Sequence, residues 1–314
     1  MKFKYFGKPD FNEIEVDGVK DKKMDITIRP DTSDSAMIKE CITNYSDILF
    51  KPTDVVMDLG ANIGGFGKIA LDAGIKHLIC FEPDPFNFEL LSYNLLKQDD
   101  YIVVHKAGIK DITLFEAAVV GDDSEEVTFV IKDNKNSACS GKVNTKEKIN
   151  ENTFHKQTVK ALNFDVVLDK YKPTIVKIDI EGGEYYILNK SLPHYVEVLA
   201  LELHGFNKSD YLKMFKVLNL LMEEWDVDFI DPICVFQQLQ LMNIVLSRKD
   251  VIDREYDFSD IDAMNIRSVK FDHIPLSDLR PLKGDGMAIM ELLKKHYNEV
   301  IKPIIEEEKS DLYD

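Results

Sequence analysis

The sequence predicts an α/β fold with a doubly wound, mostly parallel sheet, and three observations predict it. Short continuous apolar runs recur through the middle of the chain, as expected of strands that are buried on both faces. Segments with apolar residues at helical spacing lie between these runs. Strands that alternate with helices form right-handed βαβ units, and such units build a sheet whose strands run mostly parallel.

The strands predicted from these apolar runs are Val55–Leu59, His77–Phe81, Ile112–Val120, Ile175–Ile180 and Val198–Leu203. Residues that cap helices set the predicted boundaries between them. Gly74 follows a predicted helix over Gly65–Ala73, at the position where a left-handed residue closes the last turn. Asp84 is the expected N-cap of the next helix, and Pro85 is its first residue. A further helix is expected after Asn207.

The two ends of the chain and one internal stretch depart from this alternation. Residues 1–50 are expected to be an N-terminal extension that packs on a core domain of residues 51–250, and residues 251–314 to be a C-terminal extension. Within the core domain, residues 121–160 are polar and are expected to form an insertion or lid. The elements predicted in these parts are a strand at Met24–Ile28, a helix at Ala36–Tyr45, a strand at Val127–Ile131, and a C-terminal helix that includes Met290, Leu293, Tyr297 and Ile301.

Charge and cysteine usage narrow the class of protein. The 314 residues carry a formal net charge of −17, which repels a nucleic-acid backbone unless a local basic patch overrides it. The four cysteines have neither the spacing of metal ligands nor that of a disulfide framework. The sequence shows no apolar run of the roughly 18 residues that a membrane span needs, and its first residues lack the apolar part of a signal peptide. We therefore expect a cytoplasmic protein with no membrane span and no nucleic-acid partner.

A glycine-rich turn follows the first predicted core strand. It reads Asp58-Leu-Gly60-Ala-Asn62-Ile-Gly64, and the next strand ends in Glu82-Pro83. Ligands of open α/β sheets bind beyond the carboxyl ends of the strands, where glycines allow close approach and a carboxylate can accept from ribose hydroxyls. The spacing does not match the G-x-G-x-x-G of a dinucleotide site or the Gly-Lys-Ser/Thr of a P-loop. It favours a site for S-adenosylmethionine over the alternative, a turn that only connects strand and helix.

A second group of charged residues follows the strand at 175–180, in Lys177-Ile-Asp179-Ile-Glu181-Gly-Gly-Glu184. Strand alternation puts Lys177, Asp179 and Glu181 on one side. Carboxylates at the end of a buried strand are costly unless they are solvated, paired or used, so we expect Asp179 to be functional. For Glu181 and Glu184, a role in starting the next helix is an equal alternative.

The next predicted strand supplies Glu202 and His204, which alternate with leucines and therefore share a face. We expect that face to look into the same cleft as Asp179. His204 is a candidate proton acceptor, and the alternative is a histidine with a structural role only.

Taken in chain order, these residues resemble the FkbM family of S-adenosylmethionine-dependent methyltransferases over roughly residues 25–245. The stretches that carry the resemblance are Ile28-Arg29-Pro30 with Ser33-Asp34, Asp58–Gly64, Phe81-Glu82-Pro83, Ala117-Ala118-Val119, Val166–Asp169, Lys177–Gly182, Glu184 and Glu202–His204. The K-I-D-x-E-G-x-E string is the part specific to the family. One departure is Gly183, where the family usually has alanine.

The resemblance implies a seven-stranded, Rossmann-like sheet with one antiparallel strand near its edge. It also implies O-methylation, often of a sugar or polyketide hydroxyl. The donor-binding residues that it implies are Gly60, Asn62 and Gly64 beside the methionine part, Glu82 beside the ribose, and Ala117 and Ala118 beside the adenine, with Asp58 and Pro83 in the same set.

Methyl transfer to an alcohol needs a base, or a metal that lowers the pKa of the hydroxyl. We expect Asp179, Glu181 and His204 to be catalytic, with His204 as the base and Asp179 orienting it or the acceptor. An alternative is Mg²⁺ held by Asp179 and Glu202. The expected acceptor is a small molecule or glycan. Two other functions stay open: a donor-binding scaffold without catalysis, and a nucleic-acid methyltransferase, which the acidic charge and the lack of an Asn-Pro-Pro-Tyr-type base pocket disfavour.

Overall fold

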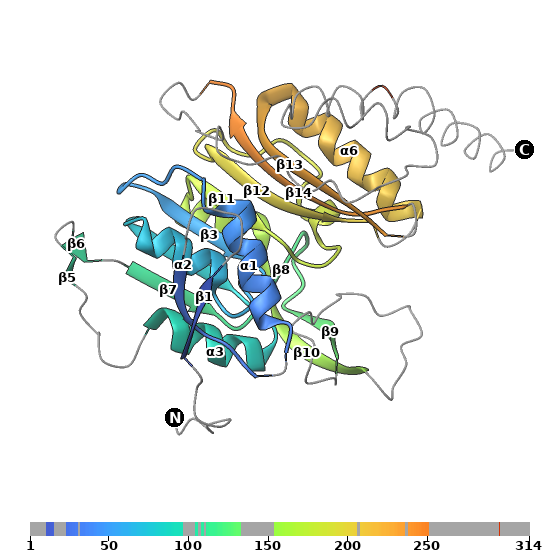
Figure 1. Cartoon of the computed structure of the whole chain (residues 1–314). Helices are drawn as coiled ribbons and strands as arrows, with labels where there is room; N and C mark the ends of the chain where they lie inside the picture. Colours follow the sequence, from blue (N-terminus) through green and yellow to red (C-terminus); the bar gives the residue numbers. More distant parts are fainter. Residues whose placement is uncertain are drawn as a thin grey trace, which may run out of the picture. The chain divides into compact units, whose positions relative to one another are not determined.

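The parallel strands and their covering helices are visible in Figure 1, a computed structural model of the whole chain. The structure describes residues 11–15, 23–30, 32–96, 104–105, 108–109, 111–132, 154–205, 208–235, 238–250 and 295. The chain divides into a first unit, Met1–Gly183, and a second unit, Glu184–Asp314. The predicted C-terminal helix and residues 133–153 of the predicted lid lie outside the described residues. The predicted division into extension, core and extension stays a prediction.

Four parallel strands form the centre of the first unit. In spatial order they are β11 (Ile175–Ile178), β3 (Val55–Leu59), β4 (His77–Phe81) and β7 (Asp111–Phe115). Strands β3, β4 and β7 follow their order in the chain, whereas β11 pairs with the other side of β3, so the strand order reverses at β3. The α/β class is therefore confirmed, and β3 and β4 have the predicted bounds. The seven-stranded sheet implied by the family resemblance stays a prediction.

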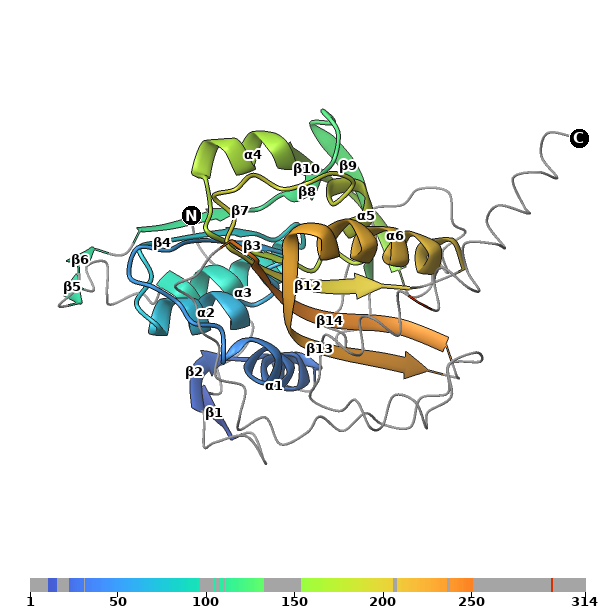
Figure 2. The same cartoon turned by 90° about the horizontal axis from the view of Figure 1, so that it is seen from above.

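Helices cover both faces of this sheet. Figure 2 shows α1 (Asp34–Tyr45), α2 (Gly65–Asp72) and α3 (Pro85–Leu96) on one side of the strands, and α4 (Phe164–Tyr171) on the other. Asp84 caps α3 as predicted, because its Oδ1 accepts a 2.8 Å hydrogen bond from the backbone N–H of Phe86. Helices on both sides bury β11, β3 and β4 on both faces, which explains their mainly apolar sequences, whereas β7 is only partly buried.

The N-terminal segment packs on this core through β2 (Lys23–Thr27), which pairs antiparallel with β1 (Phe11–Glu15). Apolar side chains of β2, α1 and the loop after β3 form one buried cluster of Met24, Ile26, Ile38, Ile42 and Ile63. Asn94 of α3 adds polar contacts, since its Nδ2 donates to the carbonyl oxygens of Thr27 and Ile63 at 3.0 and 2.8 Å. The segment is thus tied to the loop that follows β3.

The prediction of one strand over Ile112–Val120 is wrong. The segment contains two strands, β7 and β8 (Ala118–Val120), because exposed Glu116 and a bend at Ala117 separate them. Strand β8 pairs parallel with β10 (Phe154–Asn163), which pairs antiparallel with β9 (Glu126–Lys132). Residues 121–160 therefore include much of a second, smaller sheet. A short pair, β5 (Val104–His105) with β6 (Gly108–Ile109), precedes β7.

The second unit is a helix on an antiparallel sheet. Strand β12 (Val198–His204) pairs antiparallel with β14 (Gln238–Arg248), which pairs antiparallel with β13 (Trp225–Val235). Helix α6 (Lys208–Glu224) lies along these strands and buries Phe215 and Leu218, while the four-residue helix α5 (Glu184–Ile187) opens the unit. Figure 2 shows α6 lying over the three strands. The helix after Asn207 is confirmed, and the predicted strand over 198–203 extends by one residue to His204.

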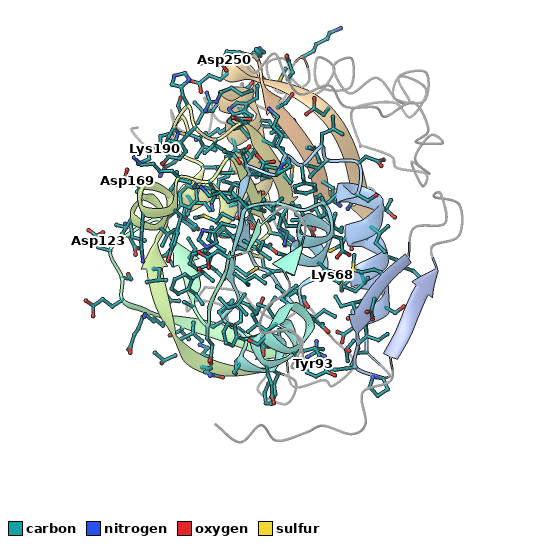
Figure 3. The ribbon with its side chains drawn as sticks, turned by 90° about the vertical axis from the view of Figure 1, so that its left-hand side faces the viewer. Lys68, Tyr93, Asp123, Asp169, Lys190 and Asp250 are labelled. Carbon is teal, nitrogen blue, oxygen red and sulfur yellow. The ribbon has the colours of Figure 1, made fainter. Side chains whose placement is uncertain are left out.

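The described surface is rich in carboxylates, in keeping with the acidic composition. Asp123 and Asp169 are exposed, and their side chains point outward at the edge of the first unit in Figure 3. Among the described helices, none combines the length and the apolar character that crossing a membrane requires.

Candidate active site

The loop that follows β3 has a backbone shape that few residues adopt. Gly60 (φ +75°), Asn62 (φ +50°) and Gly64 (φ +98°) all lie in the left-handed region, which glycine and asparagine tolerate best. The backbone N–H groups of Gly60 and Ala61 both donate to the carbonyl oxygen of Phe81, each at 3.0 Å. The end of β4 therefore holds the loop in a fixed shape.

Gly60 also packs against the chain that follows β11, and the contact is so close that no side chain would fit at position 60. A Cβ added at Gly60 would lie 1.7 Å from the carbonyl oxygen of Asp179. The backbone N–H of Asp179 in turn donates to the carbonyl oxygen of Leu59 at 3.1 Å. The structure thus brings predicted donor-site and catalytic residues together at the carboxyl ends of β3 and β11.

Glu82 joins the loops after β3 and β4. Its Oε2 accepts a 2.8 Å hydrogen bond from the backbone N–H of Asn62, and its Oε1 accepts one of the same length from the backbone N–H of Asp84. The side chain is buried, and burial raises the pKa of Glu82 to about 8 against the opposing effect of the two N–H donors. Pro83 is half-buried between these contacts. A carboxylate held by two backbone donors has a fixed orientation and keeps lone pairs for further donors.

Lys177 belongs to this site. From the sequence it was predicted only to share a strand face with Asp179, and no role was assigned to it. Its buried Nζ donates 2.8 Å to the carbonyl oxygen of Gly60 and 3.2 Å to Oδ2 of Asp179, and it lies 3.5 Å from Oδ1 of Asp58. Asp58 is fully buried, and that burial raises its pKa although the Lys177 ammonium acts in the opposite direction. One cation thus links the glycine loop to two carboxyl groups.

Ala117 and Ala118, the residues predicted to lie beside the adenine, come shortly after the end of β7. The backbone N–H of Glu82 donates a 3.0 Å hydrogen bond to the carbonyl oxygen of Phe115, the last residue of β7. Ala117 and Ala118 follow two residues later and are both buried. The donor-site residues predicted from sequence therefore lie at or shortly after the ends of three adjacent strands of the first unit, β3, β4 and β7.

Glu181 does not continue the strand, contrary to the prediction. Strand β11 ends at Ile178, and Glu181 has φ +53° in the turn that follows, beside Gly182 at φ +96°. The contact between Lys177 and Asp179 is nevertheless present. Gly183 suits this turn, because a Cβ there would lie 2.9 Å from Cδ1 of Ile180.

The second unit holds its own buried group of ionisable side chains. His204, at the end of β12, places Nδ1 3.1 Å from Oε1 of Glu184 and Nε2 3.3 Å from Oε1 of Glu202. The hydroxyl of Tyr185 donates to the backbone carbonyl of His204. Glu202 and His204 thus share a face, as predicted. The contact of Glu184 was missed, because periodicity does not show which distant residue a side chain reaches.

The solved structures to which this chain is similar include three methyltransferases. Ribosomal protein L11 methylase from Lactobacillus delbrueckii subsp. bulgaricus is 13% identical, with 69% of this chain and 81% of that chain covered and a TM-score of 0.38. Precorrin-6y C5,15-methyltransferase from Geobacter metallireducens GS-15 is 12% identical, with coverages of 71% and 93% and a TM-score of 0.35. P. horikoshii TYW2 in complex with MeSAdo is 14% identical, with coverages of 77% and 72% and a TM-score of 0.34.

The comparison with protein families is more specific. A search of the curated proteins found no match. The family described as "Methyltransferase FkbM domain" matches residues 58–229, more than half of the chain. The match begins at Asp58 and takes in Glu82, Lys177, Asp179 and His204. The chain therefore belongs to the FkbM methyltransferase family and is a methyltransferase.

Proposed function

We propose that this methyltransferase uses S-adenosylmethionine to methylate a hydroxyl group of a sugar, a glycan or another small molecule. Family membership supports the methyl transfer. The observation that favours oxygen as the acceptor atom is His204, a buried imidazole between two carboxylates at the end of β12. Oxygen acceptors must lose a proton during transfer, and histidine is the side chain best suited to take it near neutral pH.

The residues of the first unit fit S-adenosylmethionine. The backbone of Gly60 lies against the carbonyl of Asp179, which is possible only because Gly60 has no side chain, and Glu82 presents an oriented carboxyl group to a vicinal diol. The group of Lys177, Asp58 and Asp179 has two carboxyl groups for one ammonium, so it carries no excess positive charge against a cationic donor. When bound, the donor supplies an electrophilic methyl carbon on a sulfonium.

The chain's own residues then have three tasks. The glycine loop and Glu82 hold the donor in one orientation, which converts the displacement into a reaction of aligned partners. His204 accepts the hydroxyl proton at a ring nitrogen as the oxygen–carbon bond forms and the carbon–sulfur electron pair stays on sulfur. Asp179 orients the acceptor.

A neutral acceptor suits the charge of the protein. The net charge of −17 disfavours polyanions such as RNA, whose binding depends on contacts between cationic side chains and phosphates. Sugars have many hydroxyl groups and no charge, so the acidic surface does not repel them. We therefore place glycans and small polyols first among the acceptors.

Methyl transfer from S-adenosyl-[methyl-¹³C]methionine to a panel of methyl hexopyranosides, followed by ¹³C NMR, tests the proposal. We expect a new O-methyl signal with the wild-type protein, also in the presence of EDTA. His204→Asn should lower kcat by about 10²- to 10⁴-fold and leave the Kd of the donor within twofold. His194→Asn is the matched control, because His194 is exposed in the same unit and should retain full activity.

Each other outcome points to a different function. Donor binding without transfer to any hydroxylated acceptor would favour a scaffold. Transfer to RNA at low salt would favour a nucleic-acid methyltransferase. Activity that EDTA abolishes and Mg²⁺ restores would favour the metal in place of the histidine base.

A further inference from the structure

Glu184 is buried at the start of the second unit, where the sequence offered two roles for it. One role was to stabilise the N-terminus of a helix, but α5 has only four residues and therefore only a small dipole. Glu184 is 0% exposed, and its Oε1 lies 3.1 Å from Nδ1 of His204. Leaving a carboxylate this deeply buried without such a donor would be costly. The side chain contact thus favours a role beside the imidazole.

His204 is held from its backbone as well as from its ring. The hydroxyl of Tyr185, the residue after Glu184, donates to the carbonyl oxygen of His204. Burial raises the pKa of Tyr185 above its ordinary value, so this hydroxyl keeps its proton and remains a donor. Two consecutive residues of α5 therefore hold His204 at the end of β12. Tyr185 contacts its backbone carbonyl, and Glu184 contacts its imidazole.

Glu184 and Glu202 both face the imidazole, and their positions are not equivalent. Glu184 is 3.1 Å from Nδ1 and has 0% side-chain exposure, whereas Glu202 is 3.3 Å from Nε2 and has 11%. A hydrogen bond gains strength as its surroundings exclude water. The neutral ring should therefore keep its single proton on Nδ1, where Glu184 accepts it, and leave Nε2 with a lone pair.

We propose that Glu184 is a positioning residue, whose buried carboxylate accepts the Nδ1 proton of His204 and so makes Nε2 the nitrogen that receives the acceptor's proton. The proposal rests on the role of His204 given under Proposed function, which it deepens. On transfer, the hydroxyl proton moves to Nε2, the oxygen–carbon bond forms, the carbon–sulfur bond breaks, and the ring becomes an imidazolium between two carboxylates. A carboxylate on the far nitrogen stabilises that imidazolium and fixes the ring orientation.

The direct test is the tautomer of His204, which can be measured without an acceptor. In full-length protein labelled with ¹⁵N-histidine, two-bond ¹H–¹⁵N spectra separate the Nδ1–H form, the Nε2–H form and the imidazolium, and the spectrum of His204→Asn assigns the signal among the seven histidines. At pH 8 we expect the Nδ1–H form. A proton on Nε2 alone, or on both nitrogens, would overturn the proposal.

Glu184→Gln is the informative variant. An amide at 184 can donate to Nδ1 while Glu202 accepts from Nε2, so we expect the tautomer to invert. Methyl transfer to the hexopyranoside panel should then lose at least about tenfold in kcat, with the KM for the donor within twofold. An unchanged tautomer together with unchanged kcat would refute the proposal. Glu224→Gln removes another carboxylate of the unit, one that pairs with Arg248, and should change neither tautomer nor kcat.

Two further comparisons keep the result decisive. If Glu184→Gln does not fold, as judged by circular dichroism, Glu184→Asp retains a carboxylate and is expected to retain the Nδ1–H form; an Nε2–H form there would contradict the proposal. If the wild-type protein methylates no glycoside, the proposed function fails, while the tautomer in the wild type and in Glu184→Gln still decides what Glu184 does.

Discussion

The backbone N–H of Asn62 donates a 2.8 Å hydrogen bond to Oε2 of Glu82, so the loops after β3 and β4 form one connected surface. The second oxygen of Glu82 accepts from the backbone N–H of Asp84 and extends the connection to the start of α3. The carboxyl group of Glu82 therefore links the glycine-rich turn after β3 to the chain that follows β4. In the proposed complex, the donor's ribose lies against that same carboxylate.

The first prediction concerns the pH dependence of stability. The pKa of Glu82 is raised from 4.5 to about 8 by burial, so the folded state binds its proton more tightly than the unfolded state. Its stabilising contribution is therefore complete below about pH 4.5 and is lost as the pH rises through 8. Urea unfolding of the wild type and of Glu82→Gln measures this. The difference between their free energies of unfolding should fall with rising pH, by at most about 1.4 kcal/mol per pH unit.

The comparison with Glu82→Gln removes the effect of other groups, such as Asp228, whose pKa burial raises to about 7. Both proteins contain Asp228, so its titration cancels in the difference. A difference that stays flat between pH 5 and pH 9 would show that Glu82 titrates in the folded state as it does in the unfolded state.

The second prediction concerns Lys177. Lys177→Met removes the donor to Gly60 and leaves Asp58 and Asp179 without their buried cation. Loss of one partner from a buried ionic group costs about 3–5 kcal/mol, which urea unfolding can measure. Lys177→Arg keeps the charge and should cost less. Lys68→Met is the matched control, since Lys68 pairs with exposed Asp72 and such a pair is worth about 0–1 kcal/mol. Equal losses for Lys177→Met and Lys68→Met would contradict the account.

The third prediction separates two reasons for a glycine at position 60. Gly60 and Gly74 both have positive φ, at +75° and +90°, but a Cβ at Gly74 meets nothing within 4 Å, whereas one at Gly60 meets the carbonyl oxygen of Asp179. Gly74→Ala should therefore cost only the left-handed backbone, about 1–2 kcal/mol. Gly60→Ala should cost at least about 1–3 kcal/mol more, because it also overpacks the site.

Donor affinity completes this comparison. Calorimetry should show weaker binding of S-adenosylhomocysteine to Gly60→Ala and unchanged binding to Gly74→Ala. If the two variants behave alike in stability and in binding, the close approach of Gly60 to Asp179 has no consequence.

Much of the fold can be predicted where strong local signals agree. Strands β3 and β4 have the predicted bounds, because each is a continuous apolar run between residues that break strands. The start of α3 follows from Asp84 and Pro85, an N-cap followed by a first-turn proline. The positions of Asp58 and Glu82 at strand ends follow from these bounds.

The parts that could not be predicted depend on contacts between distant residues. Glu116 and the bend at Ala117 separate β7 from β8, yet the residues around them read as one apolar run. The long strands β13 and β14 were not predicted: Pro232 argues against a strand within β13, and neither sequence keeps a regular alternation of polar and apolar residues along its whole length. Lys177 reaches a carbonyl in another loop, and Glu184 reaches a residue of β12. Periodicity assigns a side chain to a face, but only the folded structure shows which partner it meets.

The central claim is that the surface joined by Asn62 and Glu82 binds the methyl donor. The most direct measurement is isothermal titration of S-adenosylmethionine at pH 9, where Glu82 with its pKa of about 8 is ionised. The proteins compared are the wild type, Glu82→Gln and Glu125→Gln, the last being an exposed carboxylate of the same unit. We expect binding at one site in the wild type and in Glu125→Gln, and a Kd at least roughly tenfold higher in Glu82→Gln, since hydrogen bonds to a charged group are worth about 1.5–3 kcal/mol. Equal affinity of all three proteins, or no binding by the wild type, would contradict the claim.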